Sequence, residues 1–278
     1  MAISVRCITD PACVWSWASE PALRALLVEF GENLGWTFVM GGLAREVPPE
    51  GLGSHWLDAS AESAMPTDPR VWQDGPMKSS YPACMAVKAA AEQASDGGHA
   101  YLRALREGIT CFGRKLDTTE ALVDVARDAG LDVERFRIDL GSHAIVEAFG
   151  ADLEEAREVP DAVRRADKVS WSQAVGEERV PFPTLRFEGE GGEVRHLCGF
   201  RPLEAYREAA LGAGARPSGE PRPGVLDALR RFGRMAAPEV AAVCDIAPLK
   251  AEAELAELAL EWRVRPVPVL AGRLWEPA

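Results

Sequence analysis

The first forty residues carry two kinds of hydrophobic pattern. Apolar and polar side chains alternate over residues 3–8, which is typical of a short strand. Apolar side chains then recur at close to helical spacing over residues 17–30, and residues 36–40 predict a second strand that is closed by two glycines. A strand, a helix and a strand in this order form a βαβ unit, whose two strands run parallel.

The next part of the chain changes character twice. Residues 43–72 are rich in Pro, Gly, Ser and Asp and predict a long loop. From about 75 to 175 the patterns are helical and no strand is predicted. Strand patterns return at 183–187 and 194–198 around a glycine-rich turn, which predicts a hairpin, and a helix opens at Pro202. The predicted order is therefore β-α-β, a helical block, then β-β-α.

The C-terminal part is predicted to be a separate module. Residues 213–223 have the composition of a linker. Three short helical patterns and a hairpin around residues 271–272 follow, which is the outline of a winged helix. The third helical pattern, residues 249–262, is acidic, whereas a helix that binds DNA should be basic. A packing or protein-interaction role is therefore favoured over DNA readout.

Composition and charge narrow the class of protein. Hydrophobic residues make up 47% and charged residues 27%, as in ordinary globular proteins. The net charge of −12 repels phosphate backbones and argues against nucleic-acid binding. We see no signal peptide and no apolar stretch long enough to span a membrane. The six scattered cysteines are then best interpreted as thiols in a reducing compartment, which predicts a cytoplasmic protein without a membrane contact.

Cys13 is the main chemical candidate, because it lies between the first strand and the first helix. Unpaired N–H groups and the helix dipole converge at such a position, so we expect a lowered pKa and a partly ionised thiol. Ser16 stands where a dithiol enzyme would hold its second cysteine. Its hydroxyl can stabilise a Cys13 thiolate by hydrogen bonding, but it cannot resolve a mixed disulfide. A buried structural cysteine is the alternative for Cys13.

Several motifs together resemble one family. The segments Asp10-Pro-Ala-Cys-Val-Trp-Ser-Trp17, Ser80-Tyr-Pro-Ala-Cys84, Ala129-Gly-Leu-Asp132 and Phe182-Pro-Thr-Leu185, with the stretch from Leu105 to Cys111, are similar to DsbA-like thioredoxin proteins. The nearest branch contains cytoplasmic FrnE-type disulfide isomerases and the thioredoxin-fold ClpXP adaptor. The resemblance covers about residues 1–212, and Ser16 makes this chain a monothiol Cys-x-x-Ser variant.

The resemblance implies a fold and a domain organisation. We expect an α/β thioredoxin fold with a large all-helical insertion and a small C-terminal winged-helix-like α+β module. The thioredoxin-fold domain would take residues 1–72 and 176–212, and the insertion residues 73–175. The linker would be 213–223 and the C-terminal module 224–278.

The resemblance also assigns roles to residues. Cys13 matches the nucleophile and Pro183 the cis proline beside it, so Cys13, Ser16 and Pro183 are the predicted catalytic residues. The predicted substrate-binding residues are Pro11, Trp15, Phe182, Thr184 and Cys84. Cys84 has two interpretations: a small core residue on an Ala-rich helix, or a distant resolving cysteine or soft-metal ligand. No Cys-x-x-Cys or His-x-x-x-His pattern is present, so no metal site is predicted.

Three functions remain open at this stage. In the first, Cys13 exchanges disulfides of a protein or of a thiol adduct, and an external thiol releases the product. In the second, the chain is a non-catalytic adaptor that holds a protein client. In the third, it is a glutathione-type transferase or isomerase for small molecules, as in monothiol relatives. No cofactor is expected beyond a low-molecular-weight thiol as co-substrate.

Overall fold

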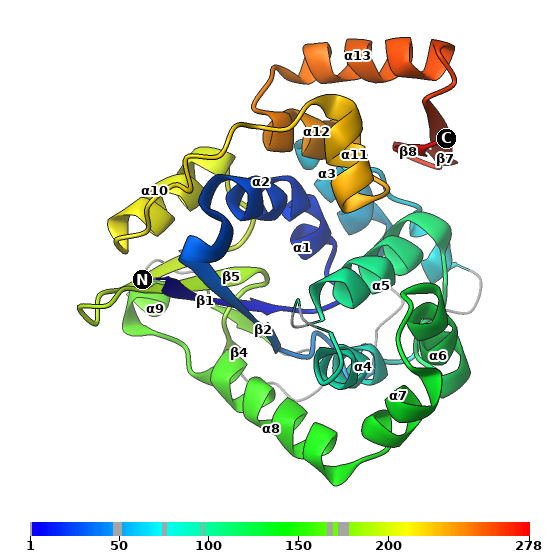
Figure 1. Ribbon diagram of the computed structural model, residues 1–278. Helices are drawn as coiled ribbons and strands as arrows, with labels where there is room; N and C mark the ends of the chain where they lie inside the picture. The colour runs from blue at the N-terminus through cyan, green and yellow to red at the C-terminus, as the bar shows by residue number, and fades with distance from the viewer. Residues whose placement is uncertain are drawn as a thin grey trace.

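A four-stranded mixed sheet lies at the centre of the molecule (Figure 1). Strand β1 (Ile3–Thr9) runs parallel to β2 (Leu34–Met40) and antiparallel to β5 (Thr184–Glu188), which pairs antiparallel with β6 (Val194–Cys198). The order β2-β1-β5-β6 confirms the predicted thioredoxin fold. The structure is a computed structural model and describes the chain except residues 1, 47–51, 74–76, 95, 97, 166–168 and 172–177.

Helices cover both faces of the sheet. Helices α2 (Glu20–Phe30) and α10 (Leu203–Gly212) lie on one face, and α4 (Tyr81–Ala91) and α8 (His143–Arg157) on the other (Figure 1). The alternating burial along β1 explains this arrangement, because its inner side chains fill the core beneath α2.

The predicted helical block is present between β2 and β5. Its helices beyond α4 and α8 are α5 (His99–Phe112), α6 (Thr119–Asp128), α7 (Val133–Leu140) and α9 (Asp161–Arg165). Three of its helices begin at side-chain caps: Thr118, Asp132 and Ser142 each accept a hydrogen bond from a backbone N–H in the first turn.

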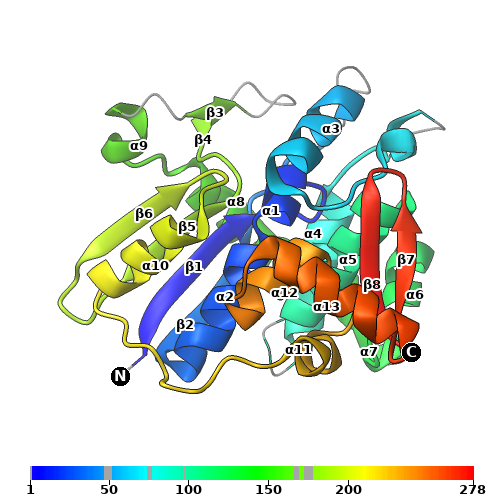
Figure 2. The ribbon, with the colours of Figure 1, turned by 90° about the horizontal axis from the view of Figure 1, so that it is seen from above.

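The C-terminal module has the predicted order of three helices and a hairpin. Its elements are α11 (Val225–Phe232), α12 (Ala237–Cys244), α13 (Pro248–Leu260), β7 (Val264–Val269) and β8 (Gly272–Pro277). Its apolar core takes in Val28 of α2, so the module packs directly on the thioredoxin-fold domain. Figure 2 shows α12 lying over α2, with α13 next to α12 on the outside of the molecule.

Four sequence-based expectations were wrong in detail. The predicted loop 43–72 contains α3 (Leu52–Ser63) and the 3-10 turn η2 (Pro69–Trp72), because Trp56 and Ala59 pack into the core at helical spacing. A two-residue strand, β3 (Ser170–Trp171), pairs with β4 (Glu178–Arg179) where no strand was expected.

The other two differences concern helix ends. The helix after Cys13 is two helices, α1 (Val14–Ala18) and α2, and the 3-10 turn η1 (Gly31–Asn33) follows them. The charged helical segment 151–168 divides into the end of α8 and the short α9. The expected domain boundary at 175/176 lies outside the described residues. Among those that are described, no helix is both long and apolar enough to cross a membrane.

Candidate functional site

The turn between β1 and α1 is organised around the buried carboxylate of Asp10. This carboxylate accepts hydrogen bonds from the backbone N–H of Ala12 at 2.8 Å and of Leu43 at 2.5 Å. It also accepts from the hydroxyl of Ser80 at 2.8 Å and from the thiol of Cys84 at 3.2 Å. Asp10 thereby ties the Cys13 turn to the loop after β2 and to the start of α4.

Cys13 occupies the N-cap position of α1, as the sequence predicts, but its sulfur is covered. The residue is 6% exposed and lies in an apolar cluster with Ile8, Val39, Ala156, Val180 and Phe182. The Cys13 Sγ donates a hydrogen bond to the Phe182 carbonyl oxygen at 3.8 Å. Apolar side chains and this carbonyl therefore surround the sulfur.

The expected lowering of the Cys13 pKa is therefore wrong. Burial raises the pKa of the Cys13 thiol above its ordinary value, and the hydrogen bonds from Ser16 lower it by less. Asp10 adds to the rise, because its negative charge opposes ionisation of the sulfur. Helix α1 has only five residues, so its dipole offers little to set against this burial.

Ser16 lies beside Cys13, as predicted, and belongs to a chain of buried polar contacts. Its Oγ accepts a hydrogen bond from the Thr9 hydroxyl at 2.8 Å, and that hydroxyl accepts one from the guanidinium of Arg106. Arg106 is fully buried and pairs with Glu20 of α2. The Cys-x-x-Ser motif is thus joined through the Thr9 side chain to a group of buried charges.

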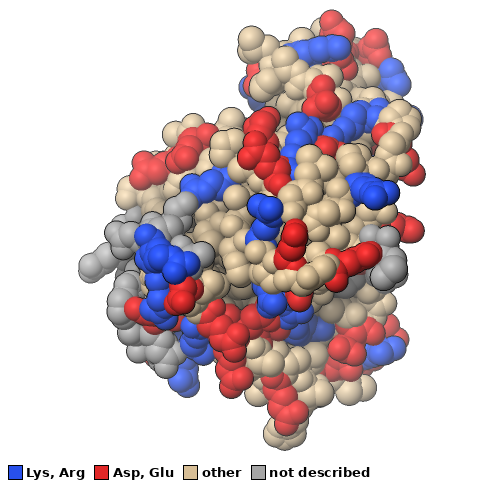
Figure 3. Space-filling view, turned by 90° about the vertical axis from the view of Figure 1, so that its left-hand side faces the viewer, with Lys and Arg blue, Asp and Glu red and all other residues tan. Residues whose placement is uncertain are grey.

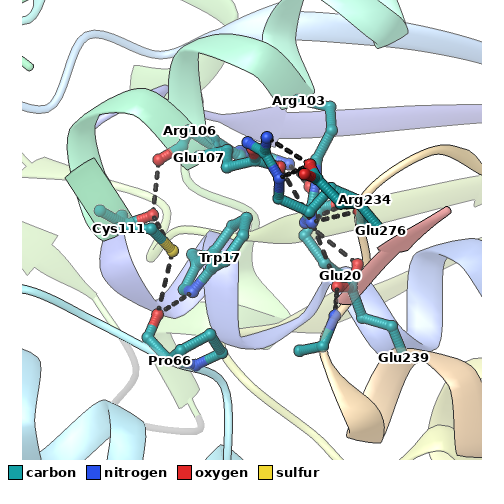
Figure 4. Close-up of polar contacts among 12 residues, drawn as sticks. Trp17, Glu20, Pro66, Arg103, Arg106, Glu107, Cys111, Arg234, Glu239 and Glu276 are labelled. Carbon is teal, nitrogen blue, oxygen red and sulfur yellow. Dashed lines mark hydrogen bonds and ion pairs between the residues drawn. The ribbon is translucent and has the colours of Figure 1, made fainter. Parts of the chain in front are cut away.

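These charges form what we call the charged junction: Glu20, Arg24, Arg103, Arg106 and Glu239. Figure 4 shows Glu20, Arg103, Arg106 and Glu239 of this group. The junction links α2, α5 and α12, and so connects the thioredoxin-fold domain, the helical block and the C-terminal module. Burial alone would raise the pKa of Glu20, but three neighbouring guanidinium groups lower it to about 2. Sequence reasoning missed this group, since its members lie far apart along the chain.

The predicted proline lies next to the thiol. The Phe182–Pro183 bond is cis, which confirms that expectation. Phe182 supplies both the carbonyl that accepts from Cys13 and a buried ring in the cluster over it. Thr184 is fully buried in β5 and its hydroxyl donates to the Pro181 carbonyl at 2.6 Å.

Arg179, like the charged junction, was not identified from the sequence. It is 8% exposed, and its guanidinium carbon lies 4.1 Å from the centre of the Phe182 ring. Its Nη1 donates to the Val180 carbonyl at 2.9 Å, its buried Nε has no hydrogen-bond partner, and no described carboxylate pairs with it. Its positive charge favours a Cys13 thiolate and so partly offsets burial.

Trp15 is the predicted site residue that reaches the surface. It is half-buried, and its Nε1 donates to the Nε2 of His55 at 2.9 Å. Its ring centre lies 5.6 Å from that of His55 and 5.8 Å from that of Phe200. We call these three residues the Trp15 face. By contrast, Pro11 and Cys84 are buried, so neither offers a surface to a substrate.

A cavity of about 540 Å³ opens next to the cluster over Cys13. It lies between the sheet and the end of α8, and its wall is Ile8, Glu155, Arg157, Glu158, Val159, Pro160, Arg164, Val180, Arg186, Val194 and His196. Ile8, Val159 and Val180 belong to this wall and also pack in the Cys13 cluster. These three side chains therefore separate the cavity from the buried sulfur.

The described residues also include possible metal ligands and charged surface side chains. No group of three or more His, Cys, Asp or Glu side chains is placed to hold a metal ion among them. On the face drawn in Figure 3, Lys and Arg side chains are interspersed with Asp and Glu rather than gathered into one basic surface.

The chain is similar over nearly its whole length to curated bacterial proteins. The ClpXP adapter protein SpxH of Halalkalibacterium halodurans is 28% identical, across 96% of this chain and 86% of that protein. The ClpXP adapter protein SpxH of Bacillus subtilis is 26% identical, across 99% of this chain and 89% of that protein. Both similarities include the C-terminal module.

Similar solved structures cover less of the chain. A candidate protein disulfide isomerase from Nitrosomonas europaea has a TM-score of 0.62 and 19% identity, and covers 77% of this chain and 100% of that one. The cytosolic disulfide reductase DsbM from Pseudomonas aeruginosa has a TM-score of 0.53 and 20% identity, and covers 74% of this chain and 91% of that one. These likenesses show the fold.

A family model gives the assignment. The model described as thioredoxin matches residues 7–162, which run from β1 through the helical block and include Cys13 and Ser16. The chain therefore belongs to the thioredoxin family and is similar over nearly its whole length to ClpXP adapter proteins.

Proposed function

We propose that this chain is an adaptor that holds a protein client and delivers it to a ClpXP-type protease. The state of Cys13 carries the proposal: its sulfur is buried, donates to a carbonyl, and has Ser16 in place of a resolving cysteine. The thiolate is the nucleophile in disulfide exchange, so a buried neutral thiol favours binding over turnover.

The pattern of similarity supports the same function. The relatives that share the C-terminal module are named as ClpXP adapters, whereas the structure titled as a disulfide reductase matches about three quarters of the chain. The charged junction joins this module to the thioredoxin-fold domain, so the two parts could present one combined surface to a client. The proposal places the protein in the cytoplasm, with a protein client and a protease as its partners.

The Trp15 face is the proposed client-binding surface. It combines a half-buried tryptophan, an imidazole and a phenylalanine, and aromatic side chains of this kind anchor protein interfaces. Phe182 and Cys13 lie behind it as a packed support rather than as reacting groups.

The proposal is tested by measuring the half-lives of proteins in the cells that naturally produce this chain. Clients are the proteins that persist both in cells without this chain and in cells without the protease. Cys13→Ser should leave their turnover unchanged, and Trp15→Ala should slow it about tenfold or more, since an anchoring tryptophan contributes about 2 kcal/mol or more. Ile138→Ala, at a residue 73% exposed on α7, is the control. Loss of turnover in Cys13→Ser with a folded protein would contradict the adaptor.

Thiol–disulfide exchange is the second candidate, favoured by the grouping of Cys13, Ser16 and Pro183 around one turn. The Cys13 thiolate would attack a client disulfide, form a mixed disulfide and release one client thiolate. A low-molecular-weight thiolate would then attack the client sulfur of the mixed disulfide, which releases the Cys13 thiolate and leaves the client joined to the small thiol by a disulfide. Cys13→Ser would abolish this function, so the same experiment separates the two candidates.

A further inference from the structure

Helix α13 presents an apolar stripe on the side that faces away from the molecule. We define the α13 stripe as Leu249, Ala253, Ala256, Leu260 and Trp262. The spacing of its four helical members, with steps of four, three and four residues, puts them on one face, opposite the buried Ala251 and Leu255. The stripe runs for about 16 Å along the helix. Figures 1 and 2 show α13 as the outermost helix of the C-terminal module.

Three side chains of this stripe are more exposed than the other large apolar side chains of the described residues. Leu249, Leu260 and Trp262 are 81%, 83% and 87% exposed, and no other large apolar side chain among the described residues exceeds 73%. Scattered apolar residues need no explanation, but Leu249 and Leu260 share one face of α13, and Trp262 follows directly after its end, so together they mark a candidate interaction surface.

Trp262 gives an independent indication. It follows α13 with a φ of 57°, a left-handed conformation that glycine adopts freely and a bulky residue adopts under strain. Its ring has no described aromatic or cationic partner, so packing does not account for a tryptophan at this position. A strained, exposed tryptophan at a helix end is typical of a functional position.

The charged side chains beside the α13 stripe indicate which kind of partner it binds. Glu252 lies along one edge of the stripe and Glu257 along the other, both exposed and neither in an ion pair with a described residue. Helix α13 carries three Glu side chains against one Lys, Lys250, which pairs with Glu254, so its exposed side is net acidic and complements a helix whose apolar residues are flanked by Lys or Arg. A second copy of this chain fits poorly, because two net acidic helix faces would then meet.

We propose that the α13 stripe is the docking surface for a basic amphipathic helix of a partner protein. Trp262, Leu260 and Leu249 are its anchors, and Glu252 and Glu257 select positive flanks. The α13 stripe would give the proposed adaptor a second contact surface, separate from the Trp15 face. Its assignment as an adaptor surface rests on the proposed function.

The binding test uses the full chain and a fluorescent 18-residue helical peptide with a Leu face flanked by Lys. A scrambled peptide of the same composition measures the nonspecific attraction between a positive peptide and this chain, whose net charge is −12. A peptide with Glu in place of Lys tests whether binding depends on positive charge in the peptide. We expect binding at least tenfold tighter than to either control, and weaker with added salt. Equal binding of the scrambled peptide, or a preference for the acidic one, would overturn the proposal.

Variants place the binding on α13. Leu260→Ser should weaken it at least tenfold, and Ile138→Ser, at another highly exposed apolar residue, should leave it unchanged. Trp262→Gly should also weaken binding tenfold while raising the Tm by ~2 °C, since glycine relieves the left-handed backbone. A Trp262→Gly protein that binds normally would overturn the proposal, as would self-association that Leu260→Ser abolishes.

Client turnover in cells separates this inference from the proposed function. If Trp15→Ala slows turnover but Trp262→Gly changes neither turnover nor peptide binding, the adaptor stands and the docking surface is wrong. If the peptide binds at α13 as described but no protein depends on this chain for its turnover, the surface stands and the adaptor is wrong.

Discussion

The charged junction and the Cys13 site are joined by hydrogen bonds and differ in how their surroundings affect ionisation. In the charged junction, Glu20 faces the guanidinium groups of Arg24, Arg103 and Arg106, and its pKa falls to about 2 despite complete burial. At the thiol site, burial dominates, and the pKa of Cys13 rises. The Thr9 hydroxyl connects the two groups.

This difference shows which task each group performs. The opposite charges of the junction lie where the thioredoxin-fold domain, the helical block and the C-terminal module meet. Removing one partner of a buried ion pair strongly destabilises the folded protein, because the other charge is left buried without a partner. At Cys13 the positive charge of Arg179 does not outweigh burial and the charge of Asp10. The molecule therefore uses its buried charge to fix geometry rather than to ionise its thiol, which agrees with an adaptor.

The largest effect should follow from neutralising the centre of the charged junction. Glu20→Gln leaves three buried guanidinium groups short of a negative charge, so we expect the free energy of unfolding to fall by about 3–5 kcal/mol. Urea denaturation of the two proteins measures this. Glu257→Gln, an exposed carboxylate on α13, should change stability by less than about 0.5 kcal/mol. Equal effects of the two substitutions would show that the junction does not hold the modules.

The pH dependence of the same variant sharpens the comparison. The pKa of Glu20 is about 2 in the folded protein, below its ordinary value of 4.5, so its stabilisation is complete above about pH 5 and declines as the pH falls toward 2. The stability difference between wild type and Glu20→Gln should therefore shrink by about 3 kcal/mol between pH 5 and pH 2. Urea midpoints across this range test it, and a constant difference would contradict the assigned pKa.

The same contrast explains what the sequence predicts and what it does not. The β1 strand, the position of Cys13 at a helix start and the hairpin of β5 and β6 follow from local patterns, and all three are present. The resemblance added the cis bond before Pro183.

The missed features depend on contacts between distant residues. Glu20 meets Arg106 across 86 positions, and Asp10 meets Cys84 across 74, so no local spacing could pair them. The burial that raises the Cys13 pKa likewise comes from Val180 and Phe182, far along the chain. Helix α3 carried a signal in its apolar spacing, which the Pro- and Gly-rich composition around it obscured.

Thiol reactivity tests the other side of the comparison. Because its pKa is raised, Cys13 should react with iodoacetamide at pH 7.5 at least ~10-fold more slowly than a cysteine in a short peptide. Ser16→Ala should slow the reaction further, since it removes a hydrogen bond that favours the thiolate, and so should Arg179→Met, which removes a positive charge. Mass spectrometry of the alkylated peptide identifies Cys13 among six cysteines, and unfolding in urea gives the unprotected rate. A reaction midpoint near pH 7 would instead indicate an activated thiol.

The smallest effect concerns Cys84, for which the sequence left two interpretations open. Burial, with the charge of Asp10, raises the pKa of the Cys84 thiol well above its ordinary value, and this thiol donates to Asp10. Cys84→Ala removes that donor, so we expect a loss of about 1 kcal/mol in urea denaturation, while Cys84→Ser keeps a donor and should cost less. Because Asp10 also holds the Cys13 turn, Cys84→Ala should alter the Cys13 alkylation rate more than Cys84→Ser does. Equal rates in both variants, together with a disulfide between Cys13 and Cys84 in the oxidised wild type, would restore Cys84 as a resolving cysteine and the thiol site as a catalyst.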